Sequence, residues 1–251
     1  MDLLARVRLV GIADILTLCA MSCGLVAIAS LVVWHDQTLA TGLIVVALVL
    51  DGMDGAAARR FGTKHDFGVT LDSLSDGVCF CVAPAVLLAV ASGVPYRGPI
   101  SALALASAAA VGVLGLARLV RYTKVGHQYV GFTGLPTPAT ALAVVVSSQL
   151  FAAQPLVPSL LGMLCALLMV SPVPYPKLGG RVGIAFAIGV GAVMGALALQ
   201  YVRPGVVSRP LFEALAAVGL ALVLGYVTIG PILALRSGAA SRPRRPPASS
   251  A

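Results

Sequence analysis

The sequence predicts an all-α membrane protein, a polytopic helical bundle of about eight transmembrane helices. Of its 251 residues, 59% are hydrophobic, 17 are Lys or Arg and 9 are Asp or Glu. A typical soluble domain is about 45–50% apolar and about 25% charged. The apolar residues form successive long runs, and 27 glycines lie among them, as in helices that pack closely in lipid. The composition therefore excludes a water-soluble globular domain.

Each predicted helix is a mainly apolar run of about 17–25 residues, the length that spans a bilayer. The runs predict helices at 12–34, 38–60, 72–93, 99–121, 137–153, 155–171, 182–202 and 211–236. Arg6 and Arg8 before the first run resemble the start of a signal peptide. The apolar stretch 15–34 is longer than a usual signal-peptide core, so we interpret it as the first helix.

The basic residues lie mainly in short loops between apolar runs, which indicates membrane topology rather than a nucleic-acid surface. With the N-terminus inside, fourteen fall on the cytoplasmic side and three outside. The cytoplasmic set is Arg6, Arg8, Arg59, Arg60, Lys64, Arg118, Arg121, Lys124, Lys177, Arg181, Arg236, Arg242, Arg244 and Arg245, and the outer set is Arg97, Arg203 and Arg209. An even number of helices then puts both termini in the cytoplasm. We therefore expect a multi-pass protein of the cell (inner) membrane with its active site facing the cytoplasm.

One membrane domain is predicted for residues 1–236, because no polar insert is long enough to fold separately. Residues 237–251 are rich in Ser, Pro, Ala and Arg and predict a disordered basic tail that contacts anionic membrane lipids. All five cysteines fall inside apolar runs and lack the spacing of a zinc site: Cys19, Cys23, Cys79, Cys81 and Cys165. We interpret them as small core residues.

Five of the nine acidic residues lie between positions 51 and 76, where the second and third predicted helices meet. An Asp deep in a membrane helix costs about 2.5–3.5 kcal/mol, so it requires a partner or a function. Asp51 and Asp54 share one helix face, and Asp72 and Asp76 share another. An antiparallel hairpin would bring the four together. The clustering argues against a cation transporter, whose acidic relay would be spread along several helices.

Four neighbouring carboxylates repel one another, so protons or metal ions must fill the site. Oxygen ligands without Cys favour Mg²⁺, Mn²⁺ or Ca²⁺ over Zn²⁺, and we interpret His65, in the connecting turn, as solvated. Three glycines in this segment would let a bulky ligand approach the backbone: Gly52, Gly55 and Gly68. Arg59 offers a planar fork for phosphate. Close helix packing is the alternative explanation of the small residues.

Across 26 positions this segment reads Asp51-x2-Asp54-Gly55-x2-Ala58-Arg59-x8-Gly68-x3-Asp72-x3-Asp76. The spacing resembles the signature of the CDP-alcohol phosphotransferase family. The resemblance implies transfer of a phosphatidyl-type group from a CDP-linked lipid to an alcohol, with release of CMP. It also implies two divalent cations, Mg²⁺ or Mn²⁺, and a homodimer.

The same resemblance implies a role for each signature residue. The metal ligands would be Asp51, Asp54, Asp72 and Asp76, with ions about 3.5–4 Å apart that neutralise the diphosphate. Asp76 would also be the catalytic base that takes the proton from the attacking hydroxyl. The cytidine diphosphate pocket would be lined by Gly52, Gly55, Ala58, Arg59 and Gly68.

Further stretches are similar to the integral-membrane phosphatidylserine synthases of bacteria, a branch of that family. These stretches are 72–76 with 82–85, 132–139, 168–171 with Tyr175 and Lys177, and 226–231. The similarity implies CDP-diacylglycerol as donor and L-serine as acceptor. Arg118, Arg121 and Lys124 after the fourth helix could hold the serine carboxylate or a phosphate, or could simply form a positive-inside loop.

Other substrates stay open from the sequence. Inositol phosphate, glycerol phosphate or choline could be the acceptor, and the donor could be an ether lipid. A phosphorylated acceptor should require more cations than this segment offers, which favours a small zwitterion. Pro136 and Pro138 open the fifth predicted helix, where backbone amides could bind an anion. The spacing of Gly191 and Gly195 favours close helix packing within the chain.

Overall fold

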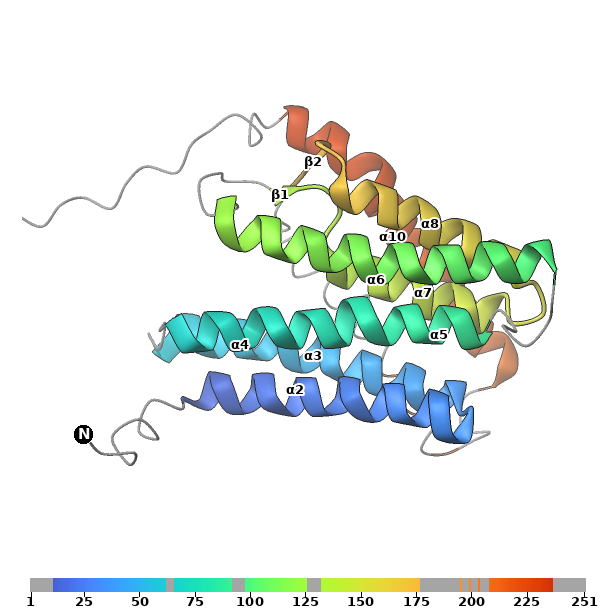
Figure 1. Ribbon diagram of the computed structural model, residues 1–251, viewed down its shortest axis with the longest axis horizontal. Coiled ribbons are helices and arrows are strands. Elements are labelled where there is room, and N and C mark those ends of the chain that lie inside the picture. Colours follow the sequence, from blue (N-terminus) through green and yellow to red (C-terminus); the bar gives the residue numbers. More distant parts are fainter. Residues whose placement is uncertain are drawn as a thin grey trace, which may run out of the picture.

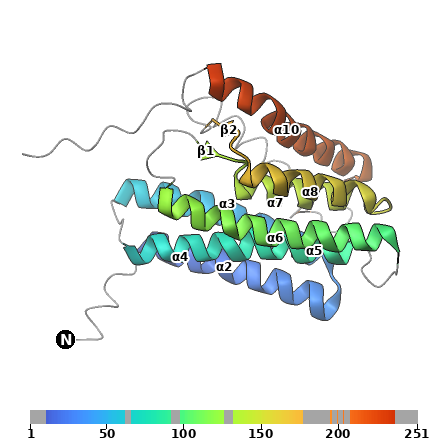
Figure 2. The ribbon, with the colours of Figure 1, turned by 45° about the horizontal axis from the view of Figure 1, so that its top comes forward.

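The computed structural model describes residues 11–61, 66–91, 98–125, 132–176 and 208–236, together with residues 195, 199 and 203. In this part of the chain, long helices run lengthwise through one bundle (Figures 1 and 2). The all-α prediction is confirmed. Nearly all of the predicted seventh helix, and the C-terminal tail at 237–251, lie outside the described residues.

The first two helices are joined by a tight turn. Helix α2 spans Ile12–Ala29 and continues as a π-helical turn, η1 (Ser30–Trp34). It ends at His35, whose left-handed backbone (φ 53°) stops the helix. Asp36 then accepts a hydrogen bond of 2.9 Å from a backbone N–H in the first turn of α3 (Gln37–Phe61).

The third predicted helix is one continuous helical rod with a π-helical turn inside it. It consists of α4 (Asp66–Asp76), η2 (Gly77–Val82) and α5 (Ala83–Ala91). The rod begins at Asp66 rather than at residue 72 as predicted. An acidic residue is favourable in a first helical turn, and apolar residues continue the helix from Phe67 onward.

The rest of the described chain consists of four helices and two short strands. Helix α6 spans Pro99–Val125, α7 Thr137–Leu150, α8 Leu156–Val170 and α10 Arg209–Arg236. Strands β1 (Phe132–Thr133) and β2 (Pro174–Tyr175) pair antiparallel. Each strand has only two residues, so the pair is a short local connection between two loops.

Five helical stretches in the described part are long and apolar enough to cross a membrane. They are Ile12–Trp34, Gln37–Ala58, Phe67–Ala91, Pro99–Thr123 and Pro210–Arg236. Helices α7 and α8 are apolar but shorter, with 14 and 15 residues. The prediction of a polytopic membrane protein is therefore confirmed in its coarse form.

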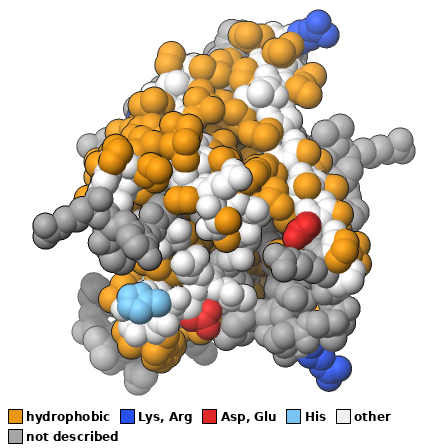
Figure 3. Space-filling model, turned by 90° about the vertical axis from the view of Figure 1, so that its right-hand side faces the viewer, with side chains coloured by type: hydrophobic (Ala, Val, Ile, Leu, Met, Phe, Trp, Pro, Cys, Tyr) orange, Lys and Arg blue, Asp and Glu red, His pale blue; other side chains and the backbone are white. Residues whose placement is uncertain are grey.

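Successive helices from α2 to α8 alternate in direction, so functional residues from different helices meet at one end. Helix α2 packs along α3 and α4, α6 packs along α5 and α8, and α7 contacts both α8 and α10. Helices α3, α6, α8 and α10 all finish at the end of the bundle where β1 and β2 lie, on the left of Figure 1. We call this the carboxylate end. On the described surface of the opposite end, hydrophobic side chains are widespread and charged ones are few (Figure 3).

Small residues bring neighbouring helices into direct contact. A Cβ atom on Gly24 would lie 2.7 Å from the Cys79 sulfur, and one on Gly115 would lie 2.7 Å from the Cys81 sulfur. Helices α2 and α6 can therefore approach η2 only because glycine stands at these positions. The interpretation of the cysteines as core residues is confirmed for Cys79, Cys81 and Cys165, whereas Cys19 is exposed.

The loop before α7 is tied to the end of α8 by a glycine with a left-handed backbone. Gly134 has φ +80°, and a Cβ atom there would collide with the carbonyl oxygen of Met169. Its N–H donates to the Val173 carbonyl at 2.8 Å, and the next N–H, of Leu135, donates to the Leu168 carbonyl at 3.0 Å. The start of α7 is thereby held at the carboxylate end.

Candidate active site

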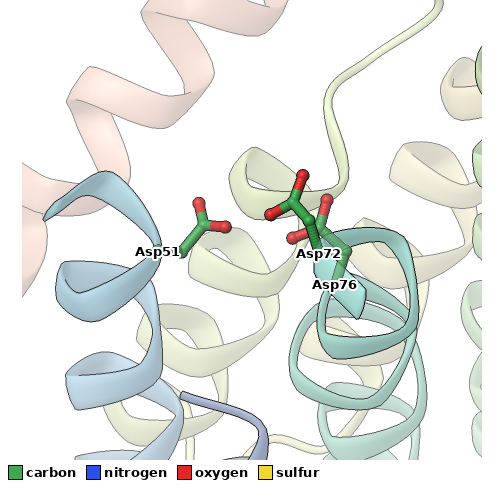
Figure 4. A group of neighbouring side chains, drawn as sticks. All are labelled: Asp51, Asp72 and Asp76. Atoms are coloured by element: carbon green, nitrogen blue, oxygen red, sulfur yellow. The ribbon is translucent and has the colours of Figure 1, made fainter. Parts of the chain in front are cut away.

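Three aspartates from two helices face one another at the carboxylate end. Asp51 comes from α3, and Asp72 and Asp76 come from successive turns of α4 (Figure 4). One carboxylate oxygen of each lies within 4.8 Å of one from each of the others. The predicted hairpin thus brings its acidic faces together. Three carboxylates at this spacing can share a hard divalent cation.

Asp76 is the most enclosed member of this group. Its Oδ1 atom is buried and has no hydrogen-bond partner in the described part of the chain, and electrostatic interactions connect its carboxyl group to Asp51 and Asp72. A buried carboxylate oxygen that lacks a protein donor fits a metal ligand, because a cation would satisfy it. Asp72 is exposed, so the group is open on the α4 side. Asp76 also ends α4 directly before the π-helical η2, a feature often found at functional sites.

Asp54 lies beside this group but bonds to α2. Its Oδ2 accepts a hydrogen bond of 2.7 Å from the Thr17 hydroxyl, and its side chain is 6% exposed. Electrostatic interactions link it to both Asp51 and Asp72. The fourth predicted ligand is therefore near the other three, with its orientation set by α2.

The small residues of the signature lie on α3 and α4. At Gly52, contact with a neighbouring helix does not require a small residue. A Cβ atom at Gly52 would meet no atom of the described chain within 4 Å, and Gly52 is exposed. Close helix packing therefore does not explain Gly52, in contrast to Gly24. Gly55, Ala58 and Gly68 are half-buried on the same two helices.

The comparison with protein families agrees with this geometry. The model of the CDP-alcohol phosphatidyltransferase family matches residues 10–173, which includes α2 to α8 and all four aspartates. The chain belongs to this family. The predicted enzyme class is confirmed: the chain is a CDP-alcohol phosphatidyltransferase.

The names of three curated relatives of this phosphatidyltransferase all contain serine. A CDP-diacylglycerol–serine O-phosphatidyltransferase of Methanocaldococcus jannaschii is 38% identical over 177 residues, covering 70% of this chain and 79% of that protein. The enzyme of the same name from Helicobacter pylori J99 is 35% identical over 115 residues, 45% of this chain and 46% of that protein, so the match spans about half its length. An archaetidylserine synthase of Methanothermobacter thermautotrophicus is 31% identical over 146 residues, 55% of this chain and 58% of that protein.

Of the two predicted acceptor residues of the phosphatidyltransferase whose side chains are described, Arg118 is buried and Arg121 is exposed. The Arg118 side chain is 5% exposed, and its guanidinium carbon lies 5.9 Å from the centre of the Tyr122 ring. Electrostatic interactions connect it to Asp76 on α4 and to Tyr226 on α10. Arg118 therefore places a positive charge beside the carboxylate group.

Arg121 has a different environment. It donates to the carbonyls of Val170 at 3.1 Å, Thr133 at 3.2 Å and Met169 at 3.4 Å. A cation at the C-terminal end of a helix stabilises the carbonyls that have no partner within that helix. Arg121 thus connects α6 to the end of α8 and to β1. The side chains of Arg59 and Lys124 lie outside the described residues.

Thr17 is a site residue that the sequence reasoning missed. Besides binding Asp54, its carbonyl accepts a hydrogen bond of 3.3 Å from Ser75 of α4. In the sequence, Thr17 looks like an ordinary residue of the first apolar run except in one respect. It is a polar residue one turn after Asp14, on the same face of a membrane helix.

Proposed function

We propose that this phosphatidyltransferase transfers a phosphatidyl group from CDP-diacylglycerol to the hydroxyl of L-serine, giving phosphatidylserine and CMP. The observation that carries the proposal is the group formed by Asp51, Asp72 and Asp76 in a member of this family. The names of the relatives agree on serine and differ in the lipid, phosphatidyl or archaetidyl. They therefore support the acceptor more strongly than the lipid part of the donor.

Two divalent cations, Mg²⁺ or Mn²⁺, are part of the proposal. Asp51, Asp54, Asp72 and Asp76 would hold them. The oxygen-only donors and the buried, partnerless Oδ1 of Asp76 fit such ions. When bound, the cations would neutralise the diphosphate and stabilise the leaving CMP.

The remaining chemistry is assigned to side chains of this chain. The serine oxygen forms a bond to the phosphorus that carries the lipid, and the bond from this phosphorus to the CMP oxygen breaks. Asp76, enclosed next to Asp51, accepts the hydroxyl proton. The open space beside Gly52, with Gly55, Ala58, Arg59 and Gly68 near it, is where we place the cytidine diphosphate.

We assign the serine carboxylate to Arg118 rather than to Arg121. Arg121 is exposed and donates to three backbone carbonyls, and Arg118 is buried and interacts electrostatically with Asp76. A buried guanidinium holds a carboxylate more strongly than an exposed one, because water competes less for it.

Replacing Arg118 by Met is therefore expected to raise the KM for serine by about 30-fold or more, with a much smaller change in the KM for CDP-diacylglycerol. Steady-state kinetics with labelled CDP-diacylglycerol and a panel of alcohols would measure both constants. Arg236→Met, at the exposed end of α10, is the control.

The Arg118→Met variant should also lose the preference for serine over ethanolamine, which lacks the carboxylate. If wild-type protein consumed inositol phosphate or glycerol phosphate and ignored serine, the acceptor assignment would be wrong while the transferase chemistry would stand.

The orientation in the membrane is a further part of the proposal. We propose eight transmembrane helices in a cell (inner) membrane domain at 1–236, with both termini and the active site on the cytoplasmic side, a basic tail at 237–251, and a homodimer. Helix α8 ends and α10 begins at opposite ends of the bundle, as this count requires (Figure 1). The excess of basic residues on one side supports the orientation.

A cysteine introduced at Thr63, which lies between α3 and α4 in the sequence, is expected to react with a membrane-impermeant thiol reagent only from the cytoplasmic side. Labelling of intact cells and of inside-out vesicles would measure this. The background of the five native cysteines, of which Cys19 is exposed, is measured in the unsubstituted protein. Labelling of the new cysteine in intact cells would reverse the proposed topology.

A further inference from the structure

Two threonines at the start of α7 have buried hydroxyls without a hydrogen-bond partner in the described chain. Thr137 is 1% exposed and Thr140 is 0% exposed, and neither Oγ1 atom has a partner. A Ser or Thr in a helix commonly donates to a carbonyl three or four residues earlier, as Ser147 of the same helix does to Val144 at 3.2 Å. A buried hydroxyl without a partner destabilises a fold, so these two require an explanation.

The same turn is also the N-terminal end of a helix of 14 residues that no side chain caps. Such an end carries a partial positive charge and attracts anions. Pro136 and Pro138 fix the backbone there, and neither has an N–H group. The two hydroxyls add hydrogen-bond donors to this positive end.

The first turn of α7 lies at the same end of the bundle as the carboxylate group. One buried cluster joins residues of α2, α3, η2 and α7: Ala20, Ala47, Cys79, Phe80 and Ala141. Asp51 lies four residues nearer the carboxylate end than Ala47 on α3, and Thr137 lies four residues nearer that end than Ala141 on α7. Residues four apart share a helix face and are about 6 Å apart along its axis. Helix α7 also contacts both α3 and η2. Thr137 is therefore level with Asp51, which has a carboxylate oxygen within 4.8 Å of one from each of Asp72 and Asp76.

We propose that the first turn of α7, with the hydroxyls of Thr137 and Thr140, is a subsite for the anionic group of a substrate. The group is either the carboxylate of the amino-acid acceptor or a phosphate oxygen of the donor. Either group would lie beside the aspartates proposed to bind metal, where its negative charge would be attracted to the cations. The inference rests on the proposed function.

Replacing Thr137 or Thr140 by Val removes the hydroxyl and keeps the branched shape. The KM for one substrate is expected to rise about tenfold to a hundredfold, as for the loss of a hydrogen bond to a charged group. The melting temperature should stay the same or rise, because a buried hydroxyl without a partner is removed. Ser148→Ala is the matched control, since Ser148 is 2% exposed, also lacks a partner, and lies at the other end of α7.

The two KM values separate the sources of the anion. A rise confined to serine identifies the acceptor carboxylate, and a rise confined to CDP-diacylglycerol identifies a donor phosphate. KM values for both substrates that match those of Ser148→Ala would overturn the subsite. If wild-type protein did not transfer the phosphatidyl group to serine, the proposed function would be wrong, and this outcome is distinct from failure of the subsite. The effect of each threonine substitution on the donor would then be measured as the affinity for CDP-diacylglycerol.

Discussion

Asparagine at Asp51, Asp54 or Asp72 is expected to abolish phosphatidyl transfer, lowering the rate by more than about 10³-fold. Each substitution removes one charged oxygen ligand while keeping the size of the side chain. In Asp54→Asn the amide oxygen can still accept the hydrogen bond from Thr17, so the packing of α2 on α3 should survive. The effect should therefore appear as lost metal affinity rather than as unfolding.

Calorimetric titration with Mn²⁺, and the rise of melting temperature with added metal, would measure the affinity of each variant. Asp36→Asn is the control, because Asp36 caps α3 at the end of the bundle far from the site and Asn caps equally well. Metal affinity and turnover equal to the wild type in all three variants would exclude the two-metal site.

Asp76→Asn is expected to separate binding from chemistry. Three aspartates and the nucleotide pocket remain, so much of the affinity for the CDP-lipid should be retained. Loss of a general base typically lowers the rate by about 10²–10⁴-fold, and the lost metal contact adds to this.

The measurement is single-turnover transfer with bound CDP-diacylglycerol, alongside its equilibrium affinity. Ser73→Ala on the same helix is the control, since the Ser73 hydroxyl donates only to the Val69 carbonyl of its own helix among the hydrogen bonds described. Near-normal turnover of Asp76→Asn would refute the role of Asp76 as base.

The sequence predicted helix positions well where an apolar run is bounded by polar residues. The first predicted helix begins where α2 does, and the fourth begins where α6 does. The third predicted helix begins six residues after α4 does, because Phe67 and Leu71 already continue the helix before residue 72. Helix periodicity also predicted that Asp51, Asp72 and Asp76 would meet, because spacing along two adjacent helices determines which side chains share a face.

Contacts between distant helices could not be predicted in this way. The bond from Thr17 to Asp54 joins residues 37 positions apart, and the contacts of Arg121 with the end of α8 depend on how α6 crosses α8. Neither leaves a periodic pattern in the sequence. The burial of Arg118 beside Asp76 likewise depends on the packing of α6, so the sequence left three cations equivalent.

The hydrogen bonds of Thr17 with Asp54 and Ser75 have a consequence for how the protein enters its membrane. They satisfy polar groups of α2, α3 and α4 among themselves, within the first 76 residues of the chain. Synthesis proceeds from the N-terminus, so these three helices are synthesised before α6 to α10. Each aspartate costs about 2.5–3.5 kcal/mol when a helix inserts alone. Hydrogen bonds among α2, α3 and α4 reduce this cost when the helices insert, and they do not require the later helices.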